Sequence, residues 1–316
     1  MTSFRPWILR RLLTGLAQTA AVVVLVLALT EALPGDAAVA LAGDDPDPAR
    51  IAAIRQALHL DRPVHERLAQ WAAGLLHGDL GTSLASGRPV AGLLAEAFPP
   101  TLTLAVLTVT LLVPAGVGLG VLAAHRAGGL LDRLLSTAAL GVYAVPEFVL
   151  GVLLTAVLAL WLPLLPPTAV GVDNLLARPA VLVLPVLVLL ARPVCSLGRL
   201  VRAGMADALA APWSVHARRC GLPPARVRFA HALPNALAPA AQHLARTVDW
   251  LLCGVVVVEA LFAVPGLGTV LVNAVAARDL PVVQGLALLF GLTAVVLNLG
   301  ADAVAYRLAP RAEAAA

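Results

Sequence analysis

Residues Trp213 to Pro239 read WSVHARRCGLPPARVRFAHALPNALAP, a basic stretch in a chain that is otherwise strongly apolar. Residues 213–220 favour a short helix, Gly221 is suited to a left-handed C-terminal cap, and Pro223 prevents that helix from continuing. Pro224 suits the first turn of a second helix, because an amide hydrogen is not needed there. The stretch therefore predicts a two-helix hairpin. An ordinary connecting loop would account for the arginines, but not for this order of capping residues.

Long apolar runs lie on both sides of this stretch. The 316 residues are 60% hydrophobic, with a mean hydropathy of +0.91, whereas soluble domains are roughly 45 to 50% apolar. Charged residues make up 13% of the chain and fall between the runs. About 20 apolar residues are enough to cross the hydrocarbon core of a bilayer. The sequence predicts an all-α membrane protein with six transmembrane helices, within residues 12–33, 102–124, 134–162, 181–197, 237–262 and 282–304.

The first apolar run follows Arg5, Arg10 and Arg11 and resembles a signal peptide only in its position. The apolar core of a secretory signal has about 7 to 15 residues, and the run from Leu12 to Leu33 is longer. We therefore expect a retained anchor helix.

Arginine placement predicts the orientation of the chain. Of the 22 arginines, thirteen would lie inside: three before Leu12, two in residues 125–133, six in residues 199–235 and two from Arg307 onward. The positive-inside rule then places both termini in the cytoplasm, with the hairpin between helices 4 and 5 on the same side. Residues 34–99, polar and acidic, form an external segment. We divide the chain into residues 1–100, the anchor helix and external segment, and residues 101–316, a core with five transmembrane helices.

Several classes of function are disfavoured. The chain contains no lysine, so a phosphate-binding loop of the GxxxxGK[ST] type is absent, and it has neither an HExxH nor a GxSxG motif. We therefore expect no catalytic residues. Aromatic residues are 4% of the chain, with no basic-aromatic clusters that would indicate nucleic-acid binding. Cys195, Cys220 and Cys253 show no metal-ligand spacing, and His216, His231 and His243 match no ligand pattern, so we expect no metal site.

Ionisable residues inside membrane spans are candidates for function, because burying them in lipid is costly. Glu147 follows Pro146, where a broken helix would place its carboxylate on a water-filled path; the alternatives are a position near the membrane interface and a bond to a neighbouring helix. Arg192 either snorkels or lines the path. Asp249 is three residues from Arg246, so the two charges would neutralise each other. We assign Glu147, Arg192 and Asp249 to a translocation path.

The hairpin resembles the signature loop of ABC importer permeases of the dipeptide, oligopeptide and nickel family. Ala217, Gly221 and Leu233-Pro234 occupy the positions of the small residue, the glycine four positions later and the Leu-Pro of that signature. Val215 stands where the general motif has an acid, a departure that fits this branch. The resemblance implies that the loop docks on an ATP-hydrolysing subunit through Ala217, Arg218, Arg219, Gly221, Leu222, Leu233 and Pro234.

Further matches to this branch extend along nearly the whole chain. They are Leu60-Asp61-Arg62-Pro63, Gly78-Asp79-Leu80-Gly81-Thr82-Ser83, Arg88-Pro89-Val90, Pro100-Thr101-Leu102, Pro265-Gly266-Leu267-Gly268, Arg278-Asp279, Pro281-Val282-Val283-Gln284, Asn298, Asp302, Tyr306 and Pro310-Arg311. Ala309 departs from the family, which usually has an acid before the last Pro-Arg. By the same resemblance, a gate region would comprise Glu259, Pro265, Gly266 and Gly268.

The resemblance implies a permease subunit of an ATP-driven importer in the bacterial inner membrane. ATP and Mg would be bound by partner ATPase subunits, with no cofactor on this chain. The other partners would be a second permease subunit, an extracytoplasmic solute-binding protein and the lipid bilayer. The residues leave the solute open between peptides, nickel or a nickel chelate, and related solutes. A secondary transporter driven by an ion gradient, with Glu147 or Asp249 as the proton site, is the alternative.

Overall fold

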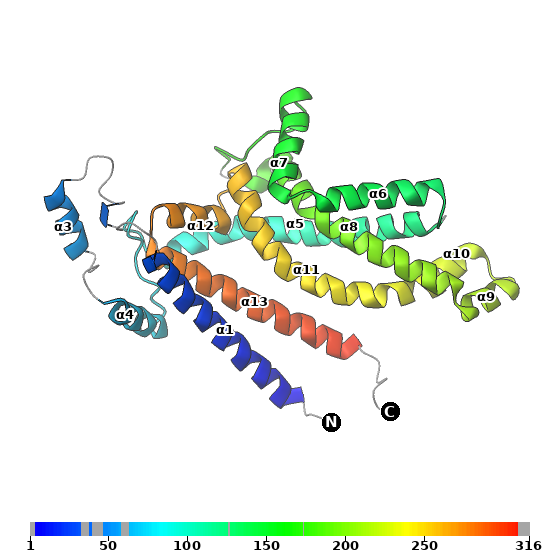
Figure 1. Ribbon diagram of the computed structural model, residues 1–316, viewed down its shortest axis with the longest axis horizontal. Helices are drawn as coiled ribbons and strands as arrows, with labels where there is room; N and C mark the ends of the chain where they lie inside the picture. Colours follow the sequence, from blue (N-terminus) through cyan, green and yellow to red (C-terminus); the bar gives the residue numbers. More distant parts are fainter. Residues whose placement is uncertain are drawn as a thin grey trace. The chain divides into compact units, whose positions relative to one another are not determined.

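The computed structural model describes residues 4–32, 38–39, 47–57, 63–125, 127–172 and 174–308. Within these ranges the only β contact is an isolated antiparallel bridge between Thr82 and Pro89. The helices, shown in Figure 1, are α1 (Phe4–Ala32), α3 (Pro48–Ala57), α4 (Val64–Leu76), α5 (Val90–His125), α6 (Leu130–Ala144), α7 (Glu147–Thr155), the π-helix η1 (Ala156–Trp161), the 3-10 helix η2 (Leu175–Ala177), α8 (Ala180–Ala210), α9 (Pro212–Arg219), α10 (Pro224–Arg226), the π-helix η3 (Val227–Ala232), α11 (Leu233–Phe262), α12 (Leu267–Ala276) and α13 (Leu280–Leu308).

Four helices are long and apolar enough to cross a membrane. Their qualifying ranges are Leu9–Val26, Val90–His125, Ala180–Ala210 and Leu280–Gly300. Two helix pairs pass the same test together, namely α6 with α7 and η1, and the end of α11 with α12. The described part of the chain is therefore all-helical with four to six candidate spans, and the predicted number of six is the upper value.

Several helices differ in length from the predicted apolar runs. Helix α5 begins at Val90, inside the stretch that we predicted to be external, and continues through Pro99 and Pro100. A proline inside a helix removes one hydrogen bond. Burial of Val90, Leu94 and Ala97 in a hydrophobic cluster offsets that loss. Likewise, α8 continues through Pro185 and Pro193 to Ala210.

The predicted third span is broken where Pro146 stands. Helix α6 ends at Ala144, Val145 and Pro146 have extended backbone angles, and α7 begins at Glu147. The two halves are bent by 105°. The residue before a proline is disfavoured in the helical region, which accounts for the position of the break.

The chain forms two compact units. The larger comprises residues 102–264 and 303–316, and in it α8 packs side by side with α11 (Figure 1). Two hydrophobic clusters hold it together, one around Leu184, Val188 and Val258 and one around Val201 and Met205. Helices α5 and α8 come so close at Gly120 that a Cβ atom there would lie 2.6 Å from Val201 Cβ. Small residues permit such contacts between membrane helices.

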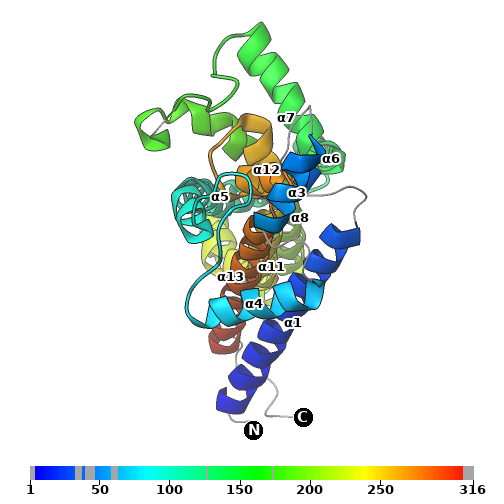
Figure 2. The same ribbon diagram turned by 90° about the vertical axis from the view of Figure 1, so that its left-hand side faces the viewer.

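The smaller unit comprises residues 1–101 and 265–302. Helices α1 and α13 run side by side in it (Figures 1 and 2), and two glycines allow their contact. A Cβ atom on Gly15 would lie 2.7 Å from Val295, and one on Gly291 would lie 2.5 Å from Thr19. The core of this unit joins the first turns of α5 to α12 and α13, through residues such as Val90, Leu267 and Leu286.

Candidate coupling hairpin and intramembrane charges

The first helix of the predicted hairpin is α9, Pro212–Arg219, with a proline in its first turn. It is tied to the end of α8. The buried Ser214 hydroxyl donates a hydrogen bond of 2.6 Å to the Ala208 carbonyl. The Arg218 guanidinium donates to the carbonyls of Leu209 and Ser214. Arg218 therefore donates a hydrogen bond to a carbonyl near the C-terminal end of α8, although the residue is exposed to solvent.

The turn after α9 is a Schellman motif, in which a left-handed residue closes the helix. Gly221 has φ +83°, and its N–H donates to the Arg218 carbonyl at 3.0 Å. The Leu222 N–H donates to the Ala217 carbonyl at 3.2 Å. These two bonds define the motif, and they explain why a glycine follows Ala217 after four positions. The predicted left-handed cap at Gly221 is confirmed.

The second half of the hairpin is continuous with a membrane helix. Pro224 lies in the first turn of α10, as predicted, and the backbone passes through the π-helix η3 into α11 without leaving the helical region. The Leu233 N–H bonds to the Arg228 carbonyl, five residues back. The second half of the hairpin and α11 therefore form one continuous helical segment.

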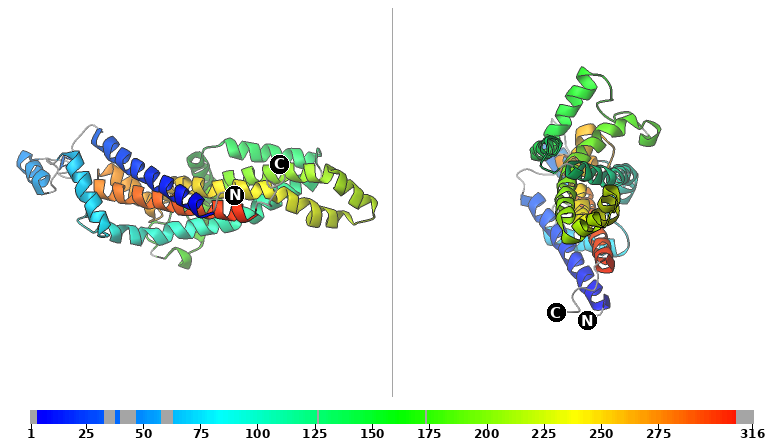
Figure 3. Two further views of the ribbon diagram at one scale, coloured as in Figure 1. Left: turned by 90° about the horizontal axis from the view of Figure 1, so that it is seen from below. Right: turned by 90° about the vertical axis from the view of Figure 1, so that its right-hand side faces the viewer.

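The hairpin lies at the far ends of α8 and α11 (Figure 3) and presents a mixed surface. Arg219, Gly221 and Pro234 are exposed, and Ala217, Leu222 and Leu233 are partly buried. Two exposed aromatic residues, Trp213 (44%) and Phe229 (54%), escaped the sequence reasoning. The sequence could have singled them out, because aromatic residues are scarce in this chain and these two lie within its basic hairpin.

At the root of the hairpin, α8 and α11 pack closely. Ala232 and Ala236 are buried in one cluster with Val201 and Met205. A Cβ atom on Gly204 would lie 3.0 Å from the Ala236 Cα atom. Little space remains for independent movement of the two helices here, because larger side chains would not fit.

Two of the three predicted path residues come together in the larger unit. Glu147 is the first residue of α7, and its Oε1 lies 3.9 Å from an Nη atom of Arg192 on α8. The ring of Tyr143 lies 4.9 Å from the guanidinium carbons of both Arg192 and Arg199. Gly254 on α11 leaves room for the carboxylate, since a Cβ atom there would lie 2.9 Å from Glu147 Oε2. Tyr143 and Glu147, which lie on the two sides of the helix break, are thus both close to Arg192 on α8.

The third predicted path residue, Asp249, lies in α11, and its side chain is outside what the structure describes. Of the proposed gate region, Glu259 is fully buried in the larger unit. Pro265, Gly266 and Gly268 belong to the smaller unit, where Gly266 precedes α12 and the Leu267 N–H donates to the Thr101 hydroxyl at 2.9 Å.

The sequence reasoning missed a further charged pair, Asp132 and Arg202. The Arg202 guanidinium forms a bidentate pair with the nearly inaccessible Asp132 carboxylate, with one N–O distance of 2.6 Å. The same carboxylate accepts bonds from the Gly128 N–H at 2.8 Å and the Ser136 hydroxyl at 3.2 Å. This pair fastens the turn before α6 to α8.

The histidines and cysteines whose side chains the structure describes do not gather into a site. His216 Nε2 lies 3.5 Å from Cys220 Sγ, and His243 is bonded to the Ser196 hydroxyl at 2.9 Å. Among the residues that the structure describes, no group of three His, Cys, Asp or Glu side chains is placed to hold a metal ion.

Comparison with known proteins gives matches along nearly the whole chain. Residues 116–314 match the family described as "Binding-protein-dependent transport system inner membrane component", and residues 4–105 match "Binding-prot-dependent transport system membrane comp, N-term". The chain is 36% identical over 307 residues to a probable peptide ABC transporter permease protein of Sinorhizobium fredii, covering 96% of this chain and 97% of that protein. It is 36% identical over 296 residues to the glutathione transport system permease protein GsiC of Pectobacterium atrosepticum, covering 94% and 95%.

Proposed function

The chain belongs to the family of binding-protein-dependent transport system inner membrane components, and from this membership we propose that it transports peptides or glutathione. It is a permease of an ABC transporter in the inner membrane and is not itself catalytic. ATP is bound by ATPase partners, and a binding protein and a partner permease complete such a system. The names of the two relatives favour a peptide over nickel as the solute. The partner permease would be a different chain.

The hairpin is the observation that supports coupling to ATP hydrolysis. In this proposal the hairpin docks on an ATPase subunit through Ala217, Arg219, Gly221 and Leu222, with Trp213 and Phe229 adding apolar contact. The Schellman motif makes the docking turn rigid, and the continuous helix from α10 into α11 carries its movement into the membrane. Arg218 holds α9 on α8, while Leu233 and Pro234 shape the junction with α11.

Within the membrane, the proposed path passes Glu147 and Arg192. A peptide carries a positive amino group and a negative carboxylate, and the two side chains offer one partner of each sign. Asp249 is retained as a further path residue. Glu259, Pro265, Gly266 and Gly268 are proposed as the gate region, because the two glycines suit a segment that changes its backbone angles.

The test is peptide uptake into proteoliposomes that contain this chain with its ATPase subunits, partner permease and binding protein. Gly221→Asp places a carboxylate and a strained left-handed residue at the docking turn. Gly171→Asp is the matched control, because Gly171 also has a positive φ (+72°) with open space around it, outside the hairpin. We expect Gly221→Asp to abolish uptake while ATP hydrolysis by the ATPase subunits continues, and Gly171→Asp to leave uptake within about twofold of the wild type.

The same vesicles decide between the two kinds of transporter. Uptake that requires ATP and every partner supports the proposal. Uptake by this chain alone, driven by a proton gradient without ATP, would replace it with the secondary transporter. Equal effects of the two glycine variants would show that the hairpin has no special part in coupling.

A further inference from the structure

A cavity of about 360 Å³ lies along the contact between α1 and α13 in the smaller unit. Arg11, Thr14 and Gln18 line it from α1, and Asn298 lines it from α13. Val22 and Leu299 are among its apolar neighbours. None of the proposed functional residues belongs to this cavity.

The polar side chains of the cavity are unusual for a membrane span. In the candidate span Leu9–Val26, the hydroxyl and amide side chains are Thr14, Gln18 and Thr19, and each of them lines the cavity. Thr19 is buried, whereas Thr14 and Gln18 are exposed on the protein surface. Within the described part of the chain, the Gln18 amide has no hydrogen-bond partner. An amide in hydrocarbon without a partner is unfavourable, which indicates that something polar occupies the cavity.

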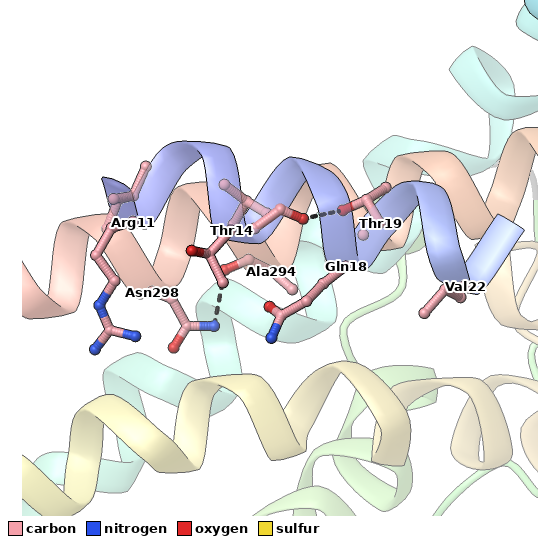
Figure 4. Close-up of a pocket in the computed structure, with 11 residues that line it drawn as sticks. Arg11, Thr14, Gln18, Thr19, Val22, Ala294 and Asn298 are labelled. Atoms are coloured by element: carbon pink, nitrogen blue, oxygen red, sulfur yellow. Dashed lines mark hydrogen bonds between the residues drawn. The ribbon is translucent and has the colours of Figure 1, made fainter. Parts of the chain in front are cut away.

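The polarity of the cavity changes in order along α1. Arg11 lies at one end, Thr14 and Gln18 follow, and Val22 lies about 16 Å from Arg11 at the rise of an α-helix. Figure 4 shows the ends of the Arg11, Gln18 and Asn298 side chains on the same side of the two helices. A phospholipid has the same order, since its charged phosphate is followed by ester carbonyls and then by hydrocarbon chains.

A third protein helix fits this cavity less well. Helices that meet inside a membrane use small residues for close contact. The small residues on this face, Gly15 and Gly291, are already covered by Val295 and Thr19. A lipid does not need small residues for its contact, because its headgroup and acyl chains adapt to the space.

We propose that the cavity binds one anionic phospholipid. Its phosphate contacts the Arg11 guanidinium, an ester carbonyl accepts a hydrogen bond from the Gln18 amide, and an acyl chain lies against Val22 and Leu299. The Thr14 hydroxyl donates to the Arg10 carbonyl at 2.8 Å, and Asn298 donates to the Ala294 carbonyl at 2.9 Å. With the N-terminus in the cytoplasm, as the arginine distribution predicts, the lipid belongs to the inner leaflet.

The test is native mass spectrometry of the assembled transporter, titrated with phosphatidylglycerol or phosphatidylcholine. Arg11→Gln removes the phosphate contact. Arg10→Gln is the matched control, because it removes the same charge at the neighbouring position, which does not line the cavity. We expect one tightly retained phosphatidylglycerol in the wild type and in Arg10→Gln. Arg11→Gln should weaken its retention by roughly tenfold or more, and Gln18→Leu should weaken it by a smaller factor.

Four results would overturn the proposal. If Arg10→Gln and Arg11→Gln lose phosphatidylglycerol equally, the lipid is attracted to basic residues in general and not to this cavity. Equal retention of phosphatidylcholine would remove the preference for an anionic lipid. Displacement by inorganic phosphate would indicate a site for a small phosphate compound. Loss of the partner permease from the Gln18→Leu complex would assign this face to a protein interface. Complexes of both arginine variants should keep the wild-type subunit composition, which shows that the substitutions leave the fold intact.

Discussion

The carboxylate of Asp279 organises the loop before α5. Asp279 is 3% exposed, and it accepts hydrogen bonds from the Ser83 hydroxyl, the Leu84 N–H at 3.0 Å and the Ala85 N–H at 3.3 Å. The sequence reasoning matched the stretches around Ser83 and Asp279 separately. The two side chains are 196 positions apart, and no local pattern relates residues at that distance. Only the packing of α13 beside the start of α5 brings them together.

Replacing Asp279 should loosen this loop. Asp279→Asn keeps the size of the side chain but replaces one acceptor oxygen with an NH2 group, which is a donor. Each buried donor left without an acceptor costs about 1 to 3 kcal/mol. We expect hydrogen exchange of the Leu84 and Ala85 amides to accelerate by roughly tenfold or more. The control is Glu96→Gln, which removes the exposed Arg88–Glu96 pair of the same region and should leave these amides unchanged. Unchanged exchange in Asp279→Asn would mean that the loop is held by other contacts.

Substitutions in the Glu147–Arg192 pair can show whether these side chains bind the transported peptide or only stabilise the protein. Single variants Glu147→Gln and Arg192→Gln should each lower peptide uptake by roughly tenfold, because each leaves one charge in the membrane without its partner. The informative measurement is uptake by the double variant. If the side chains bind the charged ends of the peptide, the double variant stays as slow as the single ones. Recovery of uptake in the double variant would assign the pair to stability alone, since no unpaired charge then remains.

At the level of secondary structure, the first helix of the hairpin, its turn and the start of the second helix were predictable, but the π-helix that follows was not. Capping rules depend on a few neighbouring residues, so Gly221 and Pro224 could be assigned from the sequence. The π-helix Val227–Ala232 has no such signature. We attribute it to Pro234, whose ring would clash with the Ala230 carbonyl in a regular α-helix and which has no N–H to donate.

Pro234→Ala should convert the π-helix to a regular α-helix. The change removes the proline to which we attribute the π-helix. A regular α-helical turn contains about one residue fewer than a π-helical turn, so the hairpin would rotate by about 100° relative to α11. We expect uptake to fall by about tenfold while the complex still assembles. Pro224→Ala is the control, because the N–H that Pro224 lacks would have no hydrogen-bond partner within the helix in the first turn of α10. Equal uptake in the two variants would contradict the assigned role of Pro234.

For the whole chain, hydrophobicity predicted the spans better than their ends. We anticipated the break at Pro146 and a span that contains Pro185 and Pro193, but not the continuous helix through Pro99 and Pro100. Each proline lowers helix stability in the same way, so the outcome depends on the surrounding packing. Pro185 and Pro193 are themselves buried within α8, where neighbouring helices surround the affected turns. Such tertiary contacts cannot be read from one segment of sequence.

The orientation of the chain in the membrane decides whether the hairpin can reach an ATPase subunit at all. We predict that the loop at Ala85 is external and that the turn at Ala127 and the hairpin at Ala225 are cytoplasmic; each of these alanines is exposed. The measurement uses a chain without Cys195, Cys220 and Cys253, carrying one new cysteine at a time. In spheroplasts, a maleimide that cannot cross the membrane should label Ala85→Cys at once. It should label Ala127→Cys and Ala225→Cys only after permeabilisation. Labelling of Ala225→Cys in intact spheroplasts would place the hairpin outside, where ATP is not hydrolysed, and the coupling mechanism would then be wrong even if the transported solute is a peptide.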